Sequence, residues 1–334
     1  MTDIRQPTLE EVARLAGVGR GTASRVVNGS DHVSQRTREA VEQAVRELGY
    51  VPNQAARSLK TRRTDTVALV IAEDEERVFA EPFFAGLVRG ISRAVDETSR
   101  RLVLSMVPDE SHLSRLGQFL TPQHVDGVMV VSLHDALSLP QGPDLPVVYV
   151  GRPNDPRACF VDVDNLGGAR RAVDHIIERG RRRVACITGP QDMASGRDRL
   201  AGYREALDAA GLPFDADLVE AGDFSETSGA RGAAVLLDRC PDLDAIFAAN
   251  DVMALGALRE LTRRGVDVPQ DVALVGFDGS AAAAASTPAL TTVHQPLAEL
   301  GATLVDVLAR RIEDPDAEPT SVILSTELRM GESS

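Results

Sequence analysis

The sequence predicts an α/β protein with a small helical head and a larger body of two lobes, each built on a parallel sheet. Three observations support this prediction. Residues 8–50 contain three short segments with the apolar spacing and capping residues of helices. From Thr66 onward, short apolar runs alternate with longer helical stretches. Residues 1–63 carry a net charge of +4, whereas residues 64–334 carry −18, so the overall charge of −14 averages two unlike parts.

The first two segments predict a helix-turn-helix. Apolar residues recur at i, i+3, i+4 and i+7 between Leu9 and Ala16, which places them on one face of a helix. Thr8 and Glu11 have the spacing of a capping box at its start, and Gly17 can adopt the left-handed conformation that ends it. A second helix is predicted over about 20–28. Two short helices joined through a glycine turn form this motif.

The third segment completes the head, and a linker follows it. Ser34 is expected to cap a helix that ends at Gly49, so that three helices share a small core within residues 1–52. Residues 53–65 are predicted to form a hinge helix and a basic linker. The hinge segment NQAARSL is shorter than two turns, and we expect it to fold only when it is docked, because helix nucleation is costly.

The outward face of the second helix carries groups that suit DNA. An exposed Arg20 or Arg25 can offer two parallel donors to a guanine edge, and Thr22 or Ser24 can bond phosphate. The alternative for any single arginine is a solvated helix face. Residues 17–21 read GVGRG, but no strand precedes them and the GxGxxG spacing is absent, so a nucleotide-binding loop is disfavoured.

The run TLEEVARLAGVGRGTASRVVNGSDHVSQRTREAVEQAVRELGYVPNQAARSL resembles the head of the LacI/GalR family of transcriptional regulators. The resemblance implies a helix-turn-helix head, a hinge helix that orders on operator DNA, and an effector-binding body shaped like a periplasmic sugar-binding protein. Gly19 stands where the family usually has a serine cap and phosphate contact. The positions implied to contact DNA are Thr8, Arg20, Gly21, Thr22, Ser24, Arg25, Asn28, His32, Asn53, Ala56 and Leu59, the last as a minor-groove wedge.

The body is expected to contain two sets of strands. The chain is predicted to pass from the first set to the second near residues 159–165 and to return near residues 291–296. This gives a lobe 1 of about 66–162 and 294–323 and a lobe 2 of about 163–293 and 324–334. The runs interpreted as strands are TVALVIA, RLVLSMV, DGVMVVS, PVVYVG, RVACITG, AIFAAN and VALVGFD.

A ligand cleft is expected between the lobes, because ligands of such sheets lie beyond the carboxyl ends of strands. Polar residues fall at those ends, and a guanidinium, a carboxylate and an amide can together bind adjacent sugar hydroxyls. As single residues, Asn250 and Asp278 could equally be turn or helix caps. The resemblance implies the effector contacts Phe83, Phe84, Arg199, Phe224, Asn250, Asp278 and Gln295.

The effector class is predicted from the same resemblance. Purine-responsive members carry a further arginine where this chain has Met193, which favours a sugar. Glu81 replaces the asparagine of the family's NPFF segment. The runs GVGRGTASRVVNGSD, AEPFFAG and GPQDM resemble a subgroup that responds to cellobiose or other oligosaccharides. We therefore expect a repressor that binds palindromic operator DNA as a homodimer and is released by a small sugar.

The sequence disfavours two other classes of protein. A nucleotide-dependent α/β enzyme is disfavoured by the lack of a P-loop, of GxGxxG after a strand and of GxSxG. A transport sugar-binding protein would leave the head unexplained. No metal or cofactor is expected, because the cysteines lack a CxxC and the histidines lack metal-ligand spacing. The histidines, expected at the surface or at caps, are His32, His112, His124, His134, His175 and His294. No apolar run approaches the roughly 20 residues of a membrane span, so a cytoplasmic protein is expected.

Overall fold

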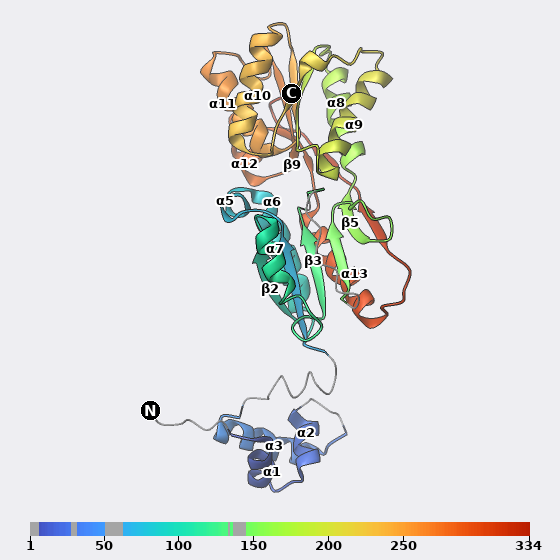
Figure 1. The fold of residues 1–334 in the computed structure, drawn as a ribbon. Coiled ribbons are helices and arrows are strands. Elements are labelled where there is room, and N and C mark those ends of the chain that lie inside the picture. Colours follow the sequence, from blue (N-terminus) through green and yellow to red (C-terminus); the bar gives the residue numbers. More distant parts are fainter. Residues whose placement is uncertain (1–6, 28–31, 51–62, 133, 136–144) are drawn as a thin grey trace. The chain divides into compact units, whose positions relative to one another are not determined.

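The computed structural model describes residues 7–27, 32–50, 63–132, 134–135 and 145–334, and it divides into two units, residues 1–64 and 65–334. The second unit is the α/β body that the sequence predicts, with two lobes (Figure 1). Its two sheets contain six strands each and have mostly parallel pairing. In the described part of the chain, no helix is long and apolar enough to cross a membrane.

The head contains the three predicted helices, α1 (Leu9–Leu15), α2 (Arg20–Val27) and α3 (Gln35–Leu48). Thr8 and Glu11 form the predicted capping box, with the Thr8 backbone N–H donating to Glu11 Oε2 at 2.7 Å. Gly17 adopts a φ of +66°, which reverses the chain between α1 and α2. Ser34 caps α3. The shared core consists of Val12, Ala13, Ala23, Val26, Val41 and Ala44.

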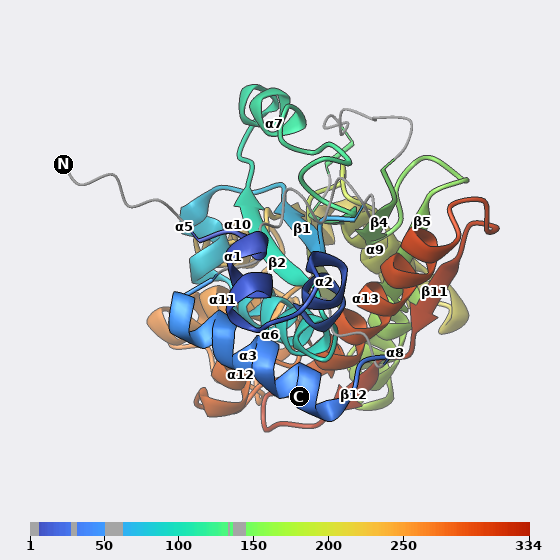
Figure 2. The ribbon, with the colours of Figure 1, turned by 90° about the horizontal axis from the view of Figure 1, so that it is seen from below.

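Lobe 1 of the body is built on a sheet in the order β11, β5, β4, β3, β1, β2. Its central strands β1 and β3 are buried along almost their whole length, as expected for a sheet covered on both faces. Helix α13 packs against α6 and against three strands of this sheet (Figure 2). The elements are β1 (Thr66–Ile71), α5 (Glu75–Ala80), α6 (Pro82–Asp96), β2 (Arg101–Met106), α7 (Glu110–Gly117), β3 (Gly127–Val131), β4 (Val147–Val150), β5 (Cys159–Val163), α13 (Leu297–Glu313) and β11 (Ser321–Leu324).

Lobe 2 has a second sheet in the order β12, β10, β9, β8, β6, β7. Helices α10 and α11 cover one face of this sheet, and α8 and α9 cover the other (Figure 1). The elements are α8 (Asn165–Glu178), β6 (Val184–Thr188), α9 (Ala194–Ala209), a short 3₁₀ helix (Ala216–Leu218), β7 (Val219–Ala221), α10 (Glu226–Arg239), β8 (Ala245–Ala248), α11 (Asp251–Arg263), β9 (Ala273–Asp278), α12 (Ala281–Ala285), β10 (Thr291–His294) and β12 (Glu327–Arg329).

The chain passes between the lobes at three places. It leaves lobe 1 after β5, returns after β10 and enters lobe 2 again between β11 and β12. Strand β12 pairs antiparallel with β10, whereas β10 pairs parallel with β9. The carboxyl ends of β1 and β3 therefore belong to one wall of the space between the lobes, and those of β6, β8 and β9 belong to the other.

Candidate functional site

The head presents arginines on the outer face of α2. The Arg20 side chain is 71% exposed, and its Nε lies 2.9 Å from Glu10 Oε1 of α1. Gly21 and Arg25 are exposed, while Thr22 and Ser24 are half-buried. An exposed ion pair of this kind is worth little in solution, because water and salt screen it. Arg20 can therefore exchange Glu10 for a phosphate or a base edge at low energetic cost.

The other predicted DNA contacts differ in what the structure says of them. The Thr8 hydroxyl accepts the Glu11 backbone N–H at 3.3 Å and takes part in the cap of α1. His32 is exposed just before α3. The remaining four, Asn28, Asn53, Ala56 and Leu59, lie outside the described residues.

The body contains a cavity of about 230 Å³ lined by residues of both lobes. All seven side chains predicted to contact an effector line it, although they come from distant parts of the sequence. Phe83 and Phe84 come from the first turn of α6, and the others come from lobe 2 and from the segment that returns after β10. The cavity therefore brings both lobe walls together. The seven residues are Phe83, Phe84, Arg199, Phe224, Asn250, Asp278 and Gln295.

Arg199 occupies the lobe 2 wall as a buried cation. Its Nε donates to Asn165 Oδ1 at 2.9 Å, and its Nη1 donates to the Ala249 carbonyl at 2.6 Å. The guanidinium carbon lies 3.7 Å from the centre of the Phe277 ring, and Nη1 lies 3.7 Å from Asp278 Oδ1. These contacts fix the orientation of the guanidinium, as precise recognition of a small ligand requires.

Asp278 and Gln295 lie side by side at the ends of neighbouring strands. Gln295 Nε2 donates to Asp278 Oδ1 at 2.7 Å. Burial raises the pKa of Asp278, and Arg199 opposes this shift. The backbone of Asp278 has a φ of +119°, a conformation that L side chains rarely adopt. Strained backbone of this kind gathers at functional sites, where the surrounding structure holds it in place.

Asn250 and Phe224 complete the lobe 2 wall, and Asn250 is both a helix cap and a lining residue of the cavity. Its Oδ1 accepts the Met253 backbone N–H at 2.8 Å and caps α11, while its Nδ2 donates to the Phe224 carbonyl at 3.0 Å. Phe224 is buried and has a φ of +71°. Its ring packs against Gly189, where a Cβ would lie only 2.3 Å from the ring. Asn250 and Gly189 thus position the aromatic face.

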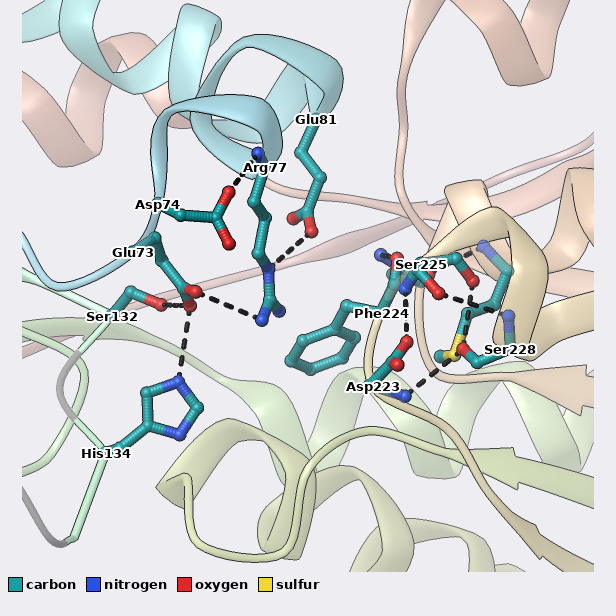
Figure 3. Close-up of polar contacts among 12 residues, drawn as sticks. Glu73, Asp74, Arg77, Glu81, Ser132, His134, Asp223, Phe224, Ser225 and Ser228 are labelled. Carbon is teal, nitrogen blue, oxygen red and sulfur yellow. Dashed lines mark hydrogen bonds and ion pairs between the residues drawn. The ribbon is translucent and has the colours of Figure 1, made fainter. Parts of the chain in front are cut away.

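The lobe 1 wall contains a cluster of charged residues, of which the sequence singled out only Glu81 (Figure 3). Arg77 lies between two carboxylates: its Nη1 is 3.1 Å from Glu73 Oε2 and its Nε is 2.8 Å from Glu81 Oε1. Its guanidinium carbon lies 5.9 Å from the centre of the Phe224 ring in the opposite lobe. Burial raises the pKa of Glu81 to about 7, against the effect of Arg77. The half-buried Phe83 and the buried Phe84 lie next to this cluster in the sequence.

His134 was expected at the surface or at a cap, and for this residue the expectation is wrong. It lines the cavity just beyond β3, and its ring nitrogens lie close to Glu73 and Asp192. Ser132 and His134 follow the buried strand GVMVV. Because ligands of parallel sheets lie beyond the carboxyl ends of strands, this position predicts that His134 lines the cavity. By contrast, His112 contacts the cap residue Asp109, as expected.

Further polar contacts join the two lobes at the edge of the cavity. Arg152 Nη2 of lobe 1 donates to both carboxylate oxygens of Asp198, at 2.7 Å each. Arg197 Nη1 of lobe 2 donates to Asp135 Oδ2 at 2.7 Å. Hydrogen bonds between a guanidinium and a carboxylate are stronger than hydrogen bonds between neutral groups. Within the described residues, no group of three or more histidine, cysteine or acidic side chains could hold a metal ion.

Two family models match the chain. The model described as bacterial regulatory proteins, lacI family, matches residues 8–53, which include the three head helices. The model described as a periplasmic binding protein-like domain matches residues 173–334, most of which form lobe 2. The matched ranges therefore cover the head and the part of the body that supplies Arg199, Phe224, Asn250 and Asp278.

Curated relatives match almost the whole length. The HTH-type transcriptional regulator CelR of Thermobifida fusca is 52% identical over 98% of both chains. The ribose operon repressor of Escherichia coli K12 is 37% identical over 92% of this chain and 94% of its own. Both of these relatives are named as regulators of transcription.

Solved structures match in the same way. A structure titled as a complex of the transcriptional regulator CelR with cellobiose has a TM-score of 0.79 and 50% identity, and the match covers 98% of this chain and all of that one. A lac repressor dimer bound to operator and an anti-inducer has a TM-score of 0.85 and 28% identity, with 98% of this chain and 99% of that chain covered. The fold thus matches a sugar complex and an operator complex of related regulators.

Proposed function

Because this chain belongs to the lacI family of bacterial regulatory proteins, we propose that it is a transcriptional repressor that binds a palindromic operator as a dimer and leaves it when a cellobiose-like sugar binds. One observation carries this proposal: a helix-turn-helix with outward arginines and a polar, aromatic-lined cavity belong to one chain. It acts by binding, without catalysis, and it works inside the cell, where its operator is.

The head supports the DNA-binding part. The exposed Arg20 and Arg25 on α2 suit base edges and phosphates in the major groove. One head reads only a half-site, and a two-fold dimer on a palindrome doubles the contacts. The lac repressor that matches in fold is itself titled as a dimer on operator. We expect a steep salt dependence, because phosphate contacts release counterions.

The charges of the cavity support an uncharged ligand. Each of its arginines is already close to a carboxylate of the protein: Arg77 to Glu81, Arg152 to Asp198 and Arg199 to Asp278. The phosphate of a phosphorylated sugar would have to displace a carboxylate from its arginine. A sugar hydroxyl can instead form a hydrogen bond with the intact pair. The lining also contains more carboxyl groups than arginines: Glu81, Asp135, Asp155, Asp162 and Asp278 against Arg77, Arg152 and Arg199, with His134 as a further titratable group.

The aromatic and polar lining supports a sugar of the kind that the CelR complex contains. The Phe83 and Phe224 side chains offer apolar surface to the C–H face of a sugar ring, and Arg199, Asp278 and Asn250 offer donors and acceptors to its hydroxyls. Such an effector can lower operator affinity only by binding better to the lobe arrangement that disfavours paired heads.

The test begins with selection of duplexes from a random DNA library by the full-length protein. Fluorescence anisotropy then measures operator affinity with increasing cellobiose. Maltose, which has the same composition but an α linkage, and cellobiose 6-phosphate serve as matched ligands. We expect a palindrome to be selected and cellobiose alone to weaken binding roughly 5- to 150-fold, the usual range of allosteric coupling. Failure to select any duplex, or operator affinity that no sugar changes, would refute the proposal.

A further inference from the structure

His134 joins the two lobes beside the cavity. It follows β3 of lobe 1, whereas Asp192 follows β6 of lobe 2. Their side chains meet with His134 Nδ1 and Asp192 Oδ2 2.7 Å apart. The backbone N–H of Asp135 also donates to the Asp192 carbonyl at 3.0 Å. The two segments therefore make a side-chain contact and a backbone contact at one place.

Both ring nitrogens of His134 face carboxylates. While Nδ1 faces Asp192, Nε2 lies 3.3 Å from Glu73 Oε1. A neutral imidazole has one donor and one acceptor nitrogen, so one of these contacts would place a lone pair against a carboxylate. The imidazolium donates from both nitrogens and satisfies both contacts. Consistently, the hydrogen bond to Glu73 and then that to Asp192 raise the pKa of His134, against a lowering effect of burial.

The two carboxylates differ in the lobe that holds them. Glu73 is fixed within lobe 1, because its Oε1 accepts the Ser132 hydroxyl at 2.5 Å and its Oε2 lies 3.1 Å from Arg77 (Figure 3). Its contact with His134 therefore persists when the lobes separate. Asp192 belongs to lobe 2, so its contact with His134 forms only when the lobes come together.

We propose that His134 is a positioning residue for effector binding: by linking Glu73 of lobe 1 to Asp192 of lobe 2, its imidazolium stabilises the lobe arrangement that encloses the effector. This inference rests on the proposed function, since it concerns the regulation of the same cavity. Neither Glu73 nor Asp192 lines the cavity. Asp192 therefore acts on the effector through His134 and not by touching it.

A dependence on pH follows. The hydrogen bond to Glu73 raises the pKa of His134 above the ordinary value of 6.5, and closing the lobes adds the hydrogen bond to Asp192, which raises it further. The gain in effector affinity is complete below about pH 6.5 and is lost as pH rises through the raised pKa, because a deprotonated ring no longer donates to both carboxylates. The charged groups around His134 are Glu73 and Asp192 in contact, Arg77 on the far side of Glu73, and the Asp135 and Arg197 pair beside it.

Other groups that line the cavity titrate in the same range. The pKa of Glu81 is raised to about 7, and that of Asp278 is raised as well. A pH profile of the native protein alone would mix their effects with that of His134. The difference in effector affinity between the native protein and Asp192→Asn at each pH reports on the contact between His134 and Asp192 alone, because both proteins keep the groups that line the cavity.

The experiment has two readouts. Histidine-selective NMR on the full-length protein follows the titration of His134, assigned by its loss in His134→Gln, without any sugar. Calorimetry measures cellobiose affinity between pH 6 and 9 for the native protein, Asp192→Asn and Asp192→Glu. His112→Ala is the matched control, because His112 lies 2.8 Å from Asp109, a residue of the same lobe.

We expect Asp192→Asn to lower the pKa of His134 and to weaken cellobiose binding about tenfold at pH 6.5 but only about twofold at pH 9. Asp192→Glu should restore the pH dependence of cellobiose affinity, and His112→Ala should leave that affinity unchanged. An unchanged His134 titration in Asp192→Asn, or a loss of affinity equal at all pH values, would overturn the proposal. If cellobiose fails to bind the native protein while Asp192→Asn still shifts the titration, the effector class is wrong and the link between the lobes stands.

Discussion

The head and the body both contain arginines that we propose for recognition, and they place them in opposite environments. The Arg20 side chain on α2 is 71% exposed and forms an ion pair with Glu10 of α1. The Arg199 side chain on α9 is 6% exposed, and it contacts an amide, a carbonyl, a carboxylate and a phenylalanine ring. An exposed arginine is free to bind a polyanion, whereas a buried one is already part of the fold.

The difference in burial means that DNA recognition by the head and ligand recognition by the body depend differently on protein stability. In the head, water and salt screen each charge, so a single contact contributes little to stability and can be exchanged for a base edge. In the body, an arginine without its partners would be an unpaired buried charge, so ligand binding and stability depend on the same contacts. Substitutions in the head should therefore change DNA selectivity alone, and substitutions in the cavity should change ligand affinity together with folding.

Arg199→Ala should have the largest effect. It removes the donor to Asn165 and Ala249 and leaves the buried Asp278 without its cation. We expect the body to lose about 3–5 kcal/mol of stability, as when one partner of a buried ion pair is removed, and cellobiose binding to disappear. Urea denaturation and calorimetry measure the two effects.

The matched control for that change is Arg204→Ala, five residues further along α9. Arg204 is exposed and lies 4.5 Å from the centre of the Phe214 ring, away from the cavity. We expect its removal to cost less than about 1 kcal/mol, in keeping with an exposed cation and ring pair, and to leave ligand affinity unchanged. A similar loss of stability in the two variants would contradict the contrast between buried and exposed arginines.

Asp278→Gly tests ligand binding with the backbone retained, because glycine accepts the φ of +119° found at this position. The variant loses the carboxyl group that Gln295 and Arg199 hold at the cavity. We expect cellobiose affinity to fall about a hundredfold, since a buried charged hydrogen-bonding group is worth about 1.5–3 kcal/mol. Operator affinity without sugar should stay within about twofold. Normal release from DNA by cellobiose would remove Asp278 from the site.

Much of the lobe 2 wall could be predicted from the sequence because its residues follow recognisable strands. Asn250 and Asp278 come directly after the apolar runs of β8 and β9, and Arg199 lies in the helix after β6. The carboxyl ends of parallel strands meet at one edge of the sheet, so residues that follow different strands in the sequence lie close together at the cavity. The three head helices were predictable for a similar reason: their caps and apolar spacing are local.

The parts of the fold and of the site that could not be predicted depend on contacts between distant segments. Strand β7 (Val219–Ala221) has no apolar run and exists through its pairing with β6. Strand β12 (Glu327–Arg329) is ordered by antiparallel pairing with β10. His134 and Asp192 each follow a strand, but nothing in the sequence indicates that the two side chains pair across the lobes. Such features follow from tertiary packing, which a reading of local periodicity does not contain.

Glu81→Gln tests whether buried carboxyls in the body make its stability depend on pH. Burial raises the pKa of Glu81 from 4.5 to about 7 in the folded protein, so the folded state binds more protons than the unfolded state in that interval. Stability should therefore fall as pH rises from about 4.5 to about 7. Glutamine stays neutral and keeps an oxygen for Arg77, so the variant should lose less stability over this range, by about 2 kcal/mol. Urea denaturation at pH 5 and pH 8 measures this difference, and equal pH dependence in both proteins would contradict it.

Arg20→Ala should have the smallest effect on the protein and a selective effect on DNA. Its ion pair with Glu10 is exposed, so the stability of the head should change by less than about 1 kcal/mol. If Arg20 binds a guanine edge, its loss should cost about 1–3 kcal/mol on the selected operator and relax the preference at one base pair of each half-site. Cellobiose affinity should be unchanged, because Arg20 lies outside the body. Anisotropy on single-base operator variants checks the result. A uniform loss across all variants, together with a smaller salt slope, would instead assign Arg20 to the phosphate backbone.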